Sequence, residues 1–304
     1  MTKGKPKDIA ASVRARLEKR AKETGRPFQE LLQYFAMERF LYRLTKSAHA
    51  DKFVLKGALM LVVWRSPVSR PTKDIDFLAR MPNDVASMAE VFRDVCRQAV
   101  EEDGLIFDAA SLEGRVIKED ADYEGVRVTF IGLLQKSRAS MQIDVGFGDV
   151  IVPGASLSDY PTILDFAAPK LYSYSRETTV AEKFEAMVKL AELNSRMKDF
   201  FDIWLLSRQF DFDGPVLSEA VRRTFGNRGT TVTASPIAWT ADFGGNAAKQ
   251  TQWAGFLRKS RLQSAPVGFL EVTSAVSTFL RPVAEAVESG EAFEMRWRAP
   301  GPWA

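Results

Sequence analysis

Residues 53–80 read FVLKGALMLVVWRSPVSRPTKDIDFLAR. This stretch contains a small-residue turn at 57–58, an apolar run of helix length, and the acidic pair Asp74 and Asp76 within a strand-like segment. Side chains alternate between the faces of a strand, so two aspartates two residues apart point the same way. Carboxylates on one face repel each other unless a cation neutralises them, and such oxygen ligands suit Mg²⁺ bound together with substrate phosphates. An isolated D-x-D is also a common strand end that faces water, so further parts of a phosphate-handling site are needed to support this interpretation.

Composition limits the classes of protein that the chain can belong to. Its 304 residues suffice for one large or two ordinary domains, and 46% hydrophobic with 27% charged residues is typical of a soluble globular protein. The longest apolar runs, such as 58–64, are far shorter than the roughly 18 residues that span a bilayer. The N-terminal segment has lysines but no apolar region behind them, as a secretory signal would have. We therefore expect a cytoplasmic protein without a membrane partner.

The chain has one cysteine and one histidine, which limits the metal sites and the kinds of catalysis that it can have. Cys96 alone excludes an internal disulfide and a cysteine metal cluster, and its apolar neighbours indicate a core thiol. His49 alone excludes a histidine-pair metal site, and its polar surroundings favour a loop or cap. Any catalysis is therefore expected from carboxylates, lysines and a metal ion.

Positive charge is concentrated in the first 50 residues, which carry 12 Lys/Arg against 5 Asp/Glu, although the net charge of the chain is only +3. A basic arm of this kind is compatible with RNA contact, and a solvated helix face explains it equally well. The candidate RNA contacts are Arg14, Arg16, Lys19 and Arg20.

The pattern of apolar residues predicts an α+β fold, with a mixed sheet and flanking helices in its first half. Helices are predicted at 8–24, 27–46 and 84–101, and strands at 105–117, 126–134 and 141–147. From residue 161 onward we expect almost only helix, with a loop at 226–251, a long helix at 268–288 and a mobile tail at 299–304. This predicts a sheet-bearing domain at 1–155, which includes the basic helices, and a mostly helical domain at 156–304.

A third carboxylate, Asp144, lies in a strand pattern that places Ile143 and Val145 on the opposite face. If its strand neighbours that of Asp74 and Asp76, the three carboxylates would gather around one or two metal ions. Two such ions can clamp the attacking and leaving oxygens of an in-line phosphoryl displacement. The alternative is an ordinary strand end before the turn at Gly146.

The helical half supplies further charged candidates. Lys183 projects from an otherwise apolar helix, where it could neutralise triphosphate oxygens or pair with a neighbouring glutamate. Asp199 and Asp202 share one face of a later helix whose aromatic neighbours indicate burial. We expect these charges at the edge of a cleft, to which the helical domain contributes Lys183 and Asp199.

The order LKG, RPTKDIDF, IDV, AEKFEAM, SRMKDFFDIW resembles that of the AbiEii/AbiGii-type nucleotidyltransferase toxins of bacterial abortive-infection toxin–antitoxin systems. The resemblance covers roughly residues 8–262, including ASVRARL near the N-terminus and W-x-x-F-L at 253–257. It implies a nucleotidyltransferase fold with a helical C-terminal domain and transfer of NMP from an NTP with Mg²⁺ or Mn²⁺. It further implies modification of the tRNA 3′ end, inhibition of translation and a cognate antitoxin.

The resemblance also implies roles for individual residues. Asp74 and Asp76 match the metal-binding D-x-D, and Asp144 matches the isolated third aspartate. Lys183 and Asp199 match the lysine and later aspartate of the family. The nucleotide contacts implied are Lys56, Gly57, Ala58, Thr72, Lys183 and Asp202.

Ala58 stands where many nucleotidyltransferases have serine, so a hydroxyl contact to phosphate is missing. Backbone N–H groups remain there, and Lys56 or Thr72 could compensate. Two alternatives therefore stay open: a nucleotidyltransferase that modifies a protein, itself included, and a catalytically degenerate nucleotide-binding module.

Overall fold

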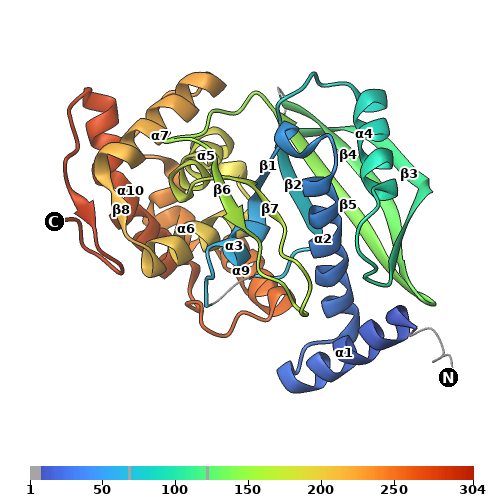
Figure 1. Ribbon diagram of the computed structural model, residues 1–304. Coiled ribbons are helices and arrows are strands. Elements are labelled where there is room, and N and C mark those ends of the chain that lie inside the picture. Colours follow the sequence, from blue (N-terminus) through green and yellow to red (C-terminus); the bar gives the residue numbers. More distant parts are fainter. Residues whose placement is uncertain (1–7, 68–69, 121–122) are drawn as a thin grey trace, which may run out of the picture. The chain divides into compact units, whose positions relative to one another are not determined.

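The computed structural model describes residues 8–67, 70–120 and 123–304, which form two compact units (Figure 1). The first unit comprises 8–65, Thr72–Gly148 and Leu157–Ser173. The second comprises Ser66–Pro71, Asp149–Ser156 and Tyr174–Ala304. The chain thus passes between the units several times. Lys3, Lys5 and Lys7 of the basic arm lie outside the described residues.

The first unit is built on a seven-stranded sheet with the order β3-β4-β5-β2-β1-β7-β6. Its strands are β1 (Phe53–Lys56), β2 (Asp74–Ala79), β3 (Leu105–Asp120), β4 (Tyr123–Leu134), β5 (Ser137–Phe147), β6 (Ser156–Asp159) and β7 (Lys170–Ser173). Strand β2 is parallel to β5 and antiparallel to β1, so the sheet is mixed. Its helical segments are α1 (Ile9–Thr24), α2 (Phe28–Lys46), η1 (Ala50–Lys52), η2 (Gly57–Leu59), α3 (Met60–Val63) and α4 (Val85–Arg97).

Local sequence signals set the helix ends. The Asp8 side chain accepts a hydrogen bond from the Ala11 N–H at the start of α1, and Gly25 ends it with φ of 66°. Asp84 caps α4 in the same way through the Ser87 N–H. The predicted helices 8–24 and 27–46 are confirmed, whereas α4 ends at Arg97 rather than at 101.

One face of the sheet is apolar and covered by helices. Ile75, Val128 and Ile143 align across β2, β4 and β5 and are fully buried. Helices α2 and α4 pack on this face (Figure 1), and the Phe40 ring of α2 lies 5.9 Å from Phe92 of α4. The core of this unit therefore lies between the sheet and these two helices.

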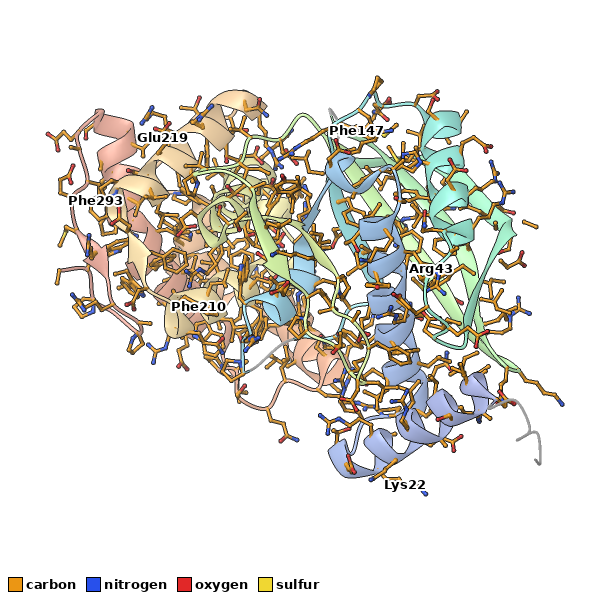
Figure 2. All side chains as sticks on the ribbon, viewed as in Figure 1. Lys22, Arg43, Phe147, Phe210, Glu219 and Phe293 are labelled. Atoms are coloured by element: carbon orange, nitrogen blue, oxygen red, sulfur yellow. The ribbon has the colours of Figure 1, made fainter. Side chains whose placement is uncertain are left out.

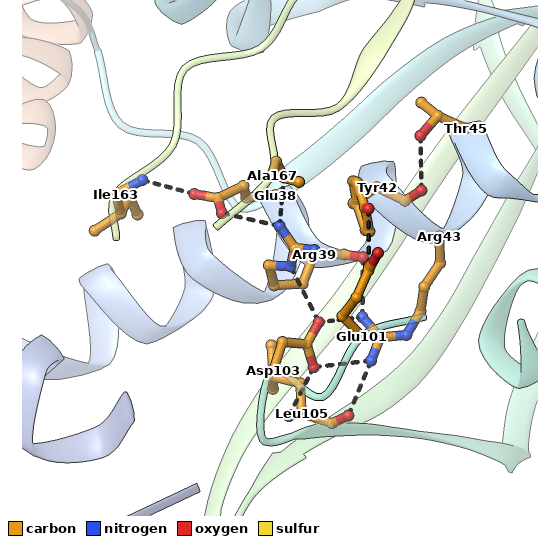
Figure 3. A network of polar contacts seen from close by, with 10 residues as sticks. All are labelled: Glu38, Arg39, Tyr42, Arg43, Thr45, Glu101, Asp103, Leu105, Ile163 and Ala167. Atoms are coloured by element: carbon orange, nitrogen blue, oxygen red, sulfur yellow. Dashed lines mark hydrogen bonds and ion pairs between the residues drawn. The ribbon is translucent and has the colours of Figure 1, made fainter. Parts of the chain in front are cut away.

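The middle of α2 buries charged side chains in a polar network (Figure 3). Arg43 makes two hydrogen bonds to Asp103, of 2.7 and 2.9 Å, and Arg39 donates a third of 3.0 Å. Arg39 also binds the carbonyl of Ala167, which ties the segment after β6 to α2. Two arginines on one aspartate leave an excess positive charge beside Glu38.

Glu38 is fully buried next to this network. Its carboxylate accepts a hydrogen bond of 2.7 Å from the Ile163 N–H and lies 3.6 Å from the Arg39 guanidinium. Burial raises the pKa of Glu38 to about 7, against the opposing effects of the Ile163 hydrogen bond and the Arg39 charge. The side chain therefore titrates near neutral pH.

The second unit is mostly helical. It contains α5 (Arg176–Leu190), η3 (Ala191–Leu193), α6 (Met197–Gln209), β8 (Phe212–Asp213), α7 (Gly214–Arg228), η4 (Ile237–Trp239), α8 (Ala241–Gly245), α9 (Ala247–Ser260), α10 (Phe269–Ser289) and β9 (Arg296–Trp297). Aromatic rings fill its core, as where Phe184 stacks on Trp239 at 5.0 Å. No helix among the described residues is long and apolar enough to cross a membrane.

Three expectations for the second half of the chain were wrong. Strand β7 interrupts the segment that was expected to be helical, because it adds to the sheet beside β1. The region 226–251 contains η4, α8 and the start of α9 rather than only a loop. The C-terminal tail is fixed, since the Trp303 ring stacks on Phe279 and its indole N–H donates to the Phe279 carbonyl at 2.8 Å.

We predict that Glu38→Gln flattens the pH dependence of stability. Between about pH 4.5 and 7 the folded state holds a proton that the unfolded state has released, so the free energy of unfolding falls as pH rises through this window. The full effect amounts to about 3 kcal/mol, and it is removed in the glutamine variant. Urea unfolding at a series of pH values measures it. An identical slope in both proteins would contradict the assignment.

Candidate active site

The other face of the sheet carries a row of charged residues. Arg127 of β4, Asp144 of β5, Asp76 of β2 and Lys56 of β1 are register partners, each with the next, across four adjacent strands. Asp74 lies two residues along β2 from Asp76 and therefore on the same face. The row has two carboxylates at its centre and a cation at each end.

The predicted alternation of β2 is confirmed. Ile75 and Phe77 are fully buried, while Asp74 and Asp76 are partly exposed on the opposite face. The predicted neighbourhood of the third aspartate is also confirmed, because Asp144 pairs directly with Asp76 across parallel strands. The sequence therefore placed all three carboxylates on one face of the sheet.

Gly57 approaches the Asp76 carboxylate closely. A Cβ atom built on Gly57 would lie 1.9 Å from Asp76 Oδ2, and the backbone has φ of 72°. Only glycine combines this conformation with this contact. The turn after β1 and the acidic pair of β2 thus form one local arrangement, as the nucleotide-site interpretation requires.

The helix expected after this turn is very short. Three residues of η2 and four of α3 replace the predicted helix-length segment, so little helix dipole is available for an anion. The Ala58 side chain is buried. Thr72 is placed just before β2, where its hydroxyl accepts a hydrogen bond of 3.3 Å from the Asp74 N–H.

Asp144 already binds a cation of the protein itself. Arg127 Nε and Nη2 donate to its two carboxylate oxygens at 2.7 and 2.6 Å. This hydrogen bonding raises the pKa of the Arg127 guanidinium, and the charges of Asp144, Asp74 and Asp76 add to the effect. Within the described residues no three His, Cys, Asp or Glu side chains are arranged to hold a metal ion.

The second unit contains a separate buried charge cluster. Lys183 Nζ of α5 lies 2.7 Å from Asp199 Oδ1 and 2.9 Å from Asp202 Oδ2, both on α6. Arg70 makes a bidentate contact of 2.8 and 3.0 Å with Asp202, and Arg196 lies 2.8 Å from Asp199. The structure thus brings together the three residues of this half that the sequence singled out.

Burial and charge act against each other on these groups. Burial alone would raise the pKa of Asp199, but the charges of Lys183 and Arg196 outweigh it and lower the pKa strongly. The pKa of Lys183 is raised, since Asp199 and Asp202 outweigh the opposite effect of burial. Burial would also raise the pKa of Asp202, but the charges of Arg70 and Lys183 outweigh it and lower the pKa. Lys183, Asp199 and Asp202 are therefore all ionised at neutral pH. Substitution of Lys183 would leave two buried carboxylates side by side, which is costly to folding.

The neighbouring glutamates of α5 do not pair with Lys183. Glu185 accepts a hydrogen bond of 3.0 Å from Arg228, and Glu182 lies 3.5 Å from the same guanidinium. Arg228 also binds Asp149 at 2.8 Å. Arg228 therefore pairs with the glutamates of α5, and Lys183 pairs with the aspartates of α6.

Two arginines of these arrangements, Arg70 and Arg127, were not predicted from sequence. Arg127 lies between Val126 and Val128 in a predicted strand, and this alternation is the signal that could have placed it beside Asp144. Arg70 lies in an irregular segment, where no periodicity indicates a partner. Of the two single residues, Cys96 is buried as expected and burial raises its pKa to about 12. His49 occupies the N-cap position of η1, where its side chain makes no capping hydrogen bond.

Comparison with known proteins defines the class to which this chain belongs. The family described as "Nucleotidyl transferase AbiEii toxin, Type IV TA system" matches residues 39–282. The chain belongs to this family and is a nucleotidyltransferase of the toxin–antitoxin type. Membership implies a nucleotide substrate and an antitoxin, and the family generally uses an NTP and a divalent metal. The resemblance seen in the sequence is confirmed.

Two solved structures are similar to the chain. A crystal structure of a putative nucleotidyltransferase from H. pylori has 14% identity and a TM-score of 0.45, with 86% of this chain and 96% of that chain covered. The crystal structure of JHP933 from Helicobacter pylori has 14% identity and a TM-score of 0.46, with 86% and 93% covered. No curated protein matches the sequence significantly.

We predict that Gly57→Ala is more harmful than the matched Gly148→Ala. Both positions have positive φ, 72° and 77°, but a Cβ on Gly148 meets nothing within 4 Å. Gly148→Ala should therefore cost only the conformational penalty of about 1 kcal/mol, and Gly57→Ala should cost several times more or displace Asp76. Chemical unfolding of the two variants measures the difference. Equal losses would show that the Asp76 contact does not constrain Gly57.

Proposed function

We propose that the chain transfers NMP from an NTP to an RNA acceptor, the tRNA 3′ end, in a Mg²⁺-dependent reaction that blocks translation. Membership in the nucleotidyltransferase toxin family supports the reaction class. The observation that carries the site is the acidic pair of β2 against Gly57, in a row flanked by cations.

The residues present fit a divalent cation. Asp74 and Asp76 offer carboxylate oxygens on one face, and Mg²⁺ is commonly held by one or two carboxylates with substrate phosphates completing its shell. Because Gly57 has no Cβ atom, the Asp76 carboxylate can pack directly against the backbone there. Such an ion would supply Lewis acidity at the transferred phosphoryl group. Asp74 and Asp76 are its proposed ligands.

Residues of this chain would also orient the nucleotide. Lys56 is the register partner of Asp76, so its side chain lies on the same face as the acidic pair. The backbone at Gly57 and Ala58 and the hydroxyl of Thr72 are the further proposed contacts. The Ala58 side chain is a buried methyl group and offers no hydroxyl to a phosphate.

Lys183, Asp199 and Asp202 are proposed to act in the same reaction. Lys183 would bind the triphosphate, and the neighbouring Asp202 would also contact the nucleotide. Efficient general bases have pKa values near the working pH, whereas the pKa of Asp199 is strongly lowered. The chemistry therefore favours Asp199 as a group that orients the acceptor hydroxyl rather than one that removes its proton.

The four basic residues of α1 that the sequence offered as RNA contacts are not equally available in the structure. Arg14 pairs with Glu18 at 2.9 Å, and the Arg16 guanidinium lies 5.2 Å from the Phe166 ring centroid. Lys19 and Arg20 are more exposed and lie 3.8 and 3.5 Å from Glu23. Lys22 projects outward from the same helix (Figure 2). The proposed RNA contact is therefore best tested at Lys19 and Arg20.

We predict that Asp76→Ala lowers transfer by about a thousandfold or more, because the metal ion at the reacting phosphoryl group would then have one protein ligand fewer. Purified protein is incubated with total tRNA, Mg²⁺ and each labelled NTP in turn, beside the variant. Label on tRNA with one NTP, absent in the variant, identifies donor, acceptor and site together.

Other results of this assay separate the alternatives. Label on the protein alone would move the acceptor to a side chain, as in a protein-modifying nucleotidyltransferase. Bound NTP without transfer in folded protein would indicate a degenerate nucleotide-binding module. Full activity of Asp76→Ala would exclude the proposed metal site.

We predict that reversing the charge of Lys19 and Arg20 to Glu weakens RNA modification. The matched control reverses Arg222 and Arg223, which are also adjacent, exposed and close to one glutamate, Glu219. For each RNA phosphate that the variant no longer neutralises, the slope of log affinity against log salt should fall by about 0.7 to 0.9. Equal effects of the two double variants on tRNA binding would remove α1 from the interface.

A further inference from the structure

The backbone that leads into β2 is held by two side chains of α2. The Tyr34 hydroxyl accepts a hydrogen bond of 3.0 Å from the Thr72 N–H. The Gln33 amide nitrogen donates to the Lys73 carbonyl at 3.3 Å and to the Ser140 carbonyl of β5 at 2.9 Å. Thr72 and Lys73 are the two residues directly before β2. These contacts therefore lie where the chain enters the proposed metal-binding strand.

The ladder between β2 and β5 begins just after this segment. Its first pair is Asp74 opposite Gln142, and the pairing continues to Ala79. Lys73 precedes the ladder, and the Gln33 amide joins it to β5 at that point. An amide NH₂ group has two donor hydrogens, which allows one side chain to join two segments. Gln33 thus sets the position of the chain relative to β5 directly ahead of the acidic pair.

Both side chains come from a helix that packs on the face of the sheet opposite the acidic pair. Helix α2 lies on the apolar face (Figure 1), whereas Asp74 and Asp76 lie on the other face. Gln33 and Tyr34 are each only 8% exposed. Hydrogen bonds between buried groups are strong, and they are costly to leave unmade. The helix can therefore hold this backbone firmly while the partly exposed carboxylates lie on the other side.

We infer that Gln33 and Tyr34 are positioning residues for the proposed metal ligand Asp74. From α2 they fix the backbone ahead of β2, and this fixes where the Asp74 carboxylate meets a divalent ion. The inference rests on the proposed function of the acidic pair. The side chains of a metal site must be held to within about 0.5 Å of their working positions, and buried supporting contacts provide this precision.

Thr72 joins the held segment to the proposed ligand. Its N–H is the group bound by Tyr34, and its hydroxyl accepts a hydrogen bond of 3.3 Å from the Asp74 N–H. Asp74 thus has strand pairing after it and these contacts before it. Without the contacts of α2, the chain before β2 can move, and the carboxylate moves with it. A ligand that has to be ordered during binding holds its ion more weakly than one that is already in place.

Binding of Mn²⁺ to the nucleotide-free full chain tests the inference. Free Mn²⁺ is counted by electron paramagnetic resonance during the titration. We expect Gln33→Met and Tyr34→Phe each to weaken binding about tenfold, because each removes a supporting contact and keeps a side chain of similar size. Asp74→Asn should weaken binding further, since it removes a charge from the ligand itself.

Two matched variants of the same helix are the controls. Gln29→Met removes an amide that donates to the Arg138 carbonyl of β5 at 2.7 Å. Tyr42→Phe removes a hydroxyl that donates to Glu101 at 2.9 Å (Figure 3). These two contacts are made away from the chain before β2. Both controls should therefore bind Mn²⁺ with an affinity within about twofold of wild type.

The spectrum of bound Mn²⁺ separates positioning from a general loss of structure. At saturating Mn²⁺ it reports the arrangement of the ligands, so it should differ from wild type in Gln33→Met and Tyr34→Phe and match wild type in both controls. Chemical unfolding shows that each variant is folded before its binding is compared. Should Gln33→Met unfold, Tyr34→Phe carries the test, because it loses a single oxygen atom.

Two sets of results distinguish failure of the inference from failure of the metal site. Wild-type affinity in the folded Gln33→Met and Tyr34→Phe variants would overturn the inference, and so would an equal loss in the two controls. Absence of Mn²⁺ binding in wild type, or unchanged binding in Asp74→Asn, would instead overturn the proposed metal site on which the inference rests.

Discussion

Repulsion between carboxylates on adjacent strands is the constraint on which the sheet face depends. Asp76 and Asp144 are register partners, and Asp74 lies on the same face. Like charges directly opposite each other destabilise a pair of strands. The first unit meets this cost with cations in the same row: Arg127 on Asp144, and Lys56 beside Asp76. A sheet face with this arrangement of charges suits the binding of a cation together with phosphate groups, as the proposed nucleotidyl transfer would require.

In the second unit, the repulsion between neighbouring carboxylates is offset by ion pairs with buried cations. Lys183 lies between two aspartates, and each of these also contacts an arginine. There the two aspartates are buried and paired with three cations of the protein, whereas the acidic pair of β2 is partly exposed. The two arrangements therefore differ in kind: the one on β2 is suited to a dissociable cation, and the one on α5 and α6 keeps its cations in fixed places. This difference explains why stability must be measured alongside activity for any variant of Lys183.

Much of the fold and of the candidate site could be predicted from short-range patterns. The period-two alternation of β2 placed Asp74 and Asp76 on one face, and a similar alternation of β5 placed Asp144 with them. Helix caps at Asp8 and Gly25 fixed α1. Patterns of this kind depend on neighbours within a few residues, and so they are visible in one sequence. The family, too, was identified from the order of such short motifs.

What the sequence determined by itself was which residues carry the chemistry and which face of a strand or helix presents them. Tertiary structure decided their partners: Arg127 for Asp144, Arg70 for Asp202, and Trp303 packed on Phe279 in place of a mobile tail. These contacts join residues 17, 132 and 24 positions apart. Only the folding of the chain brings such residues together, because strand register and helix packing are set by the burial of apolar side chains elsewhere in each unit.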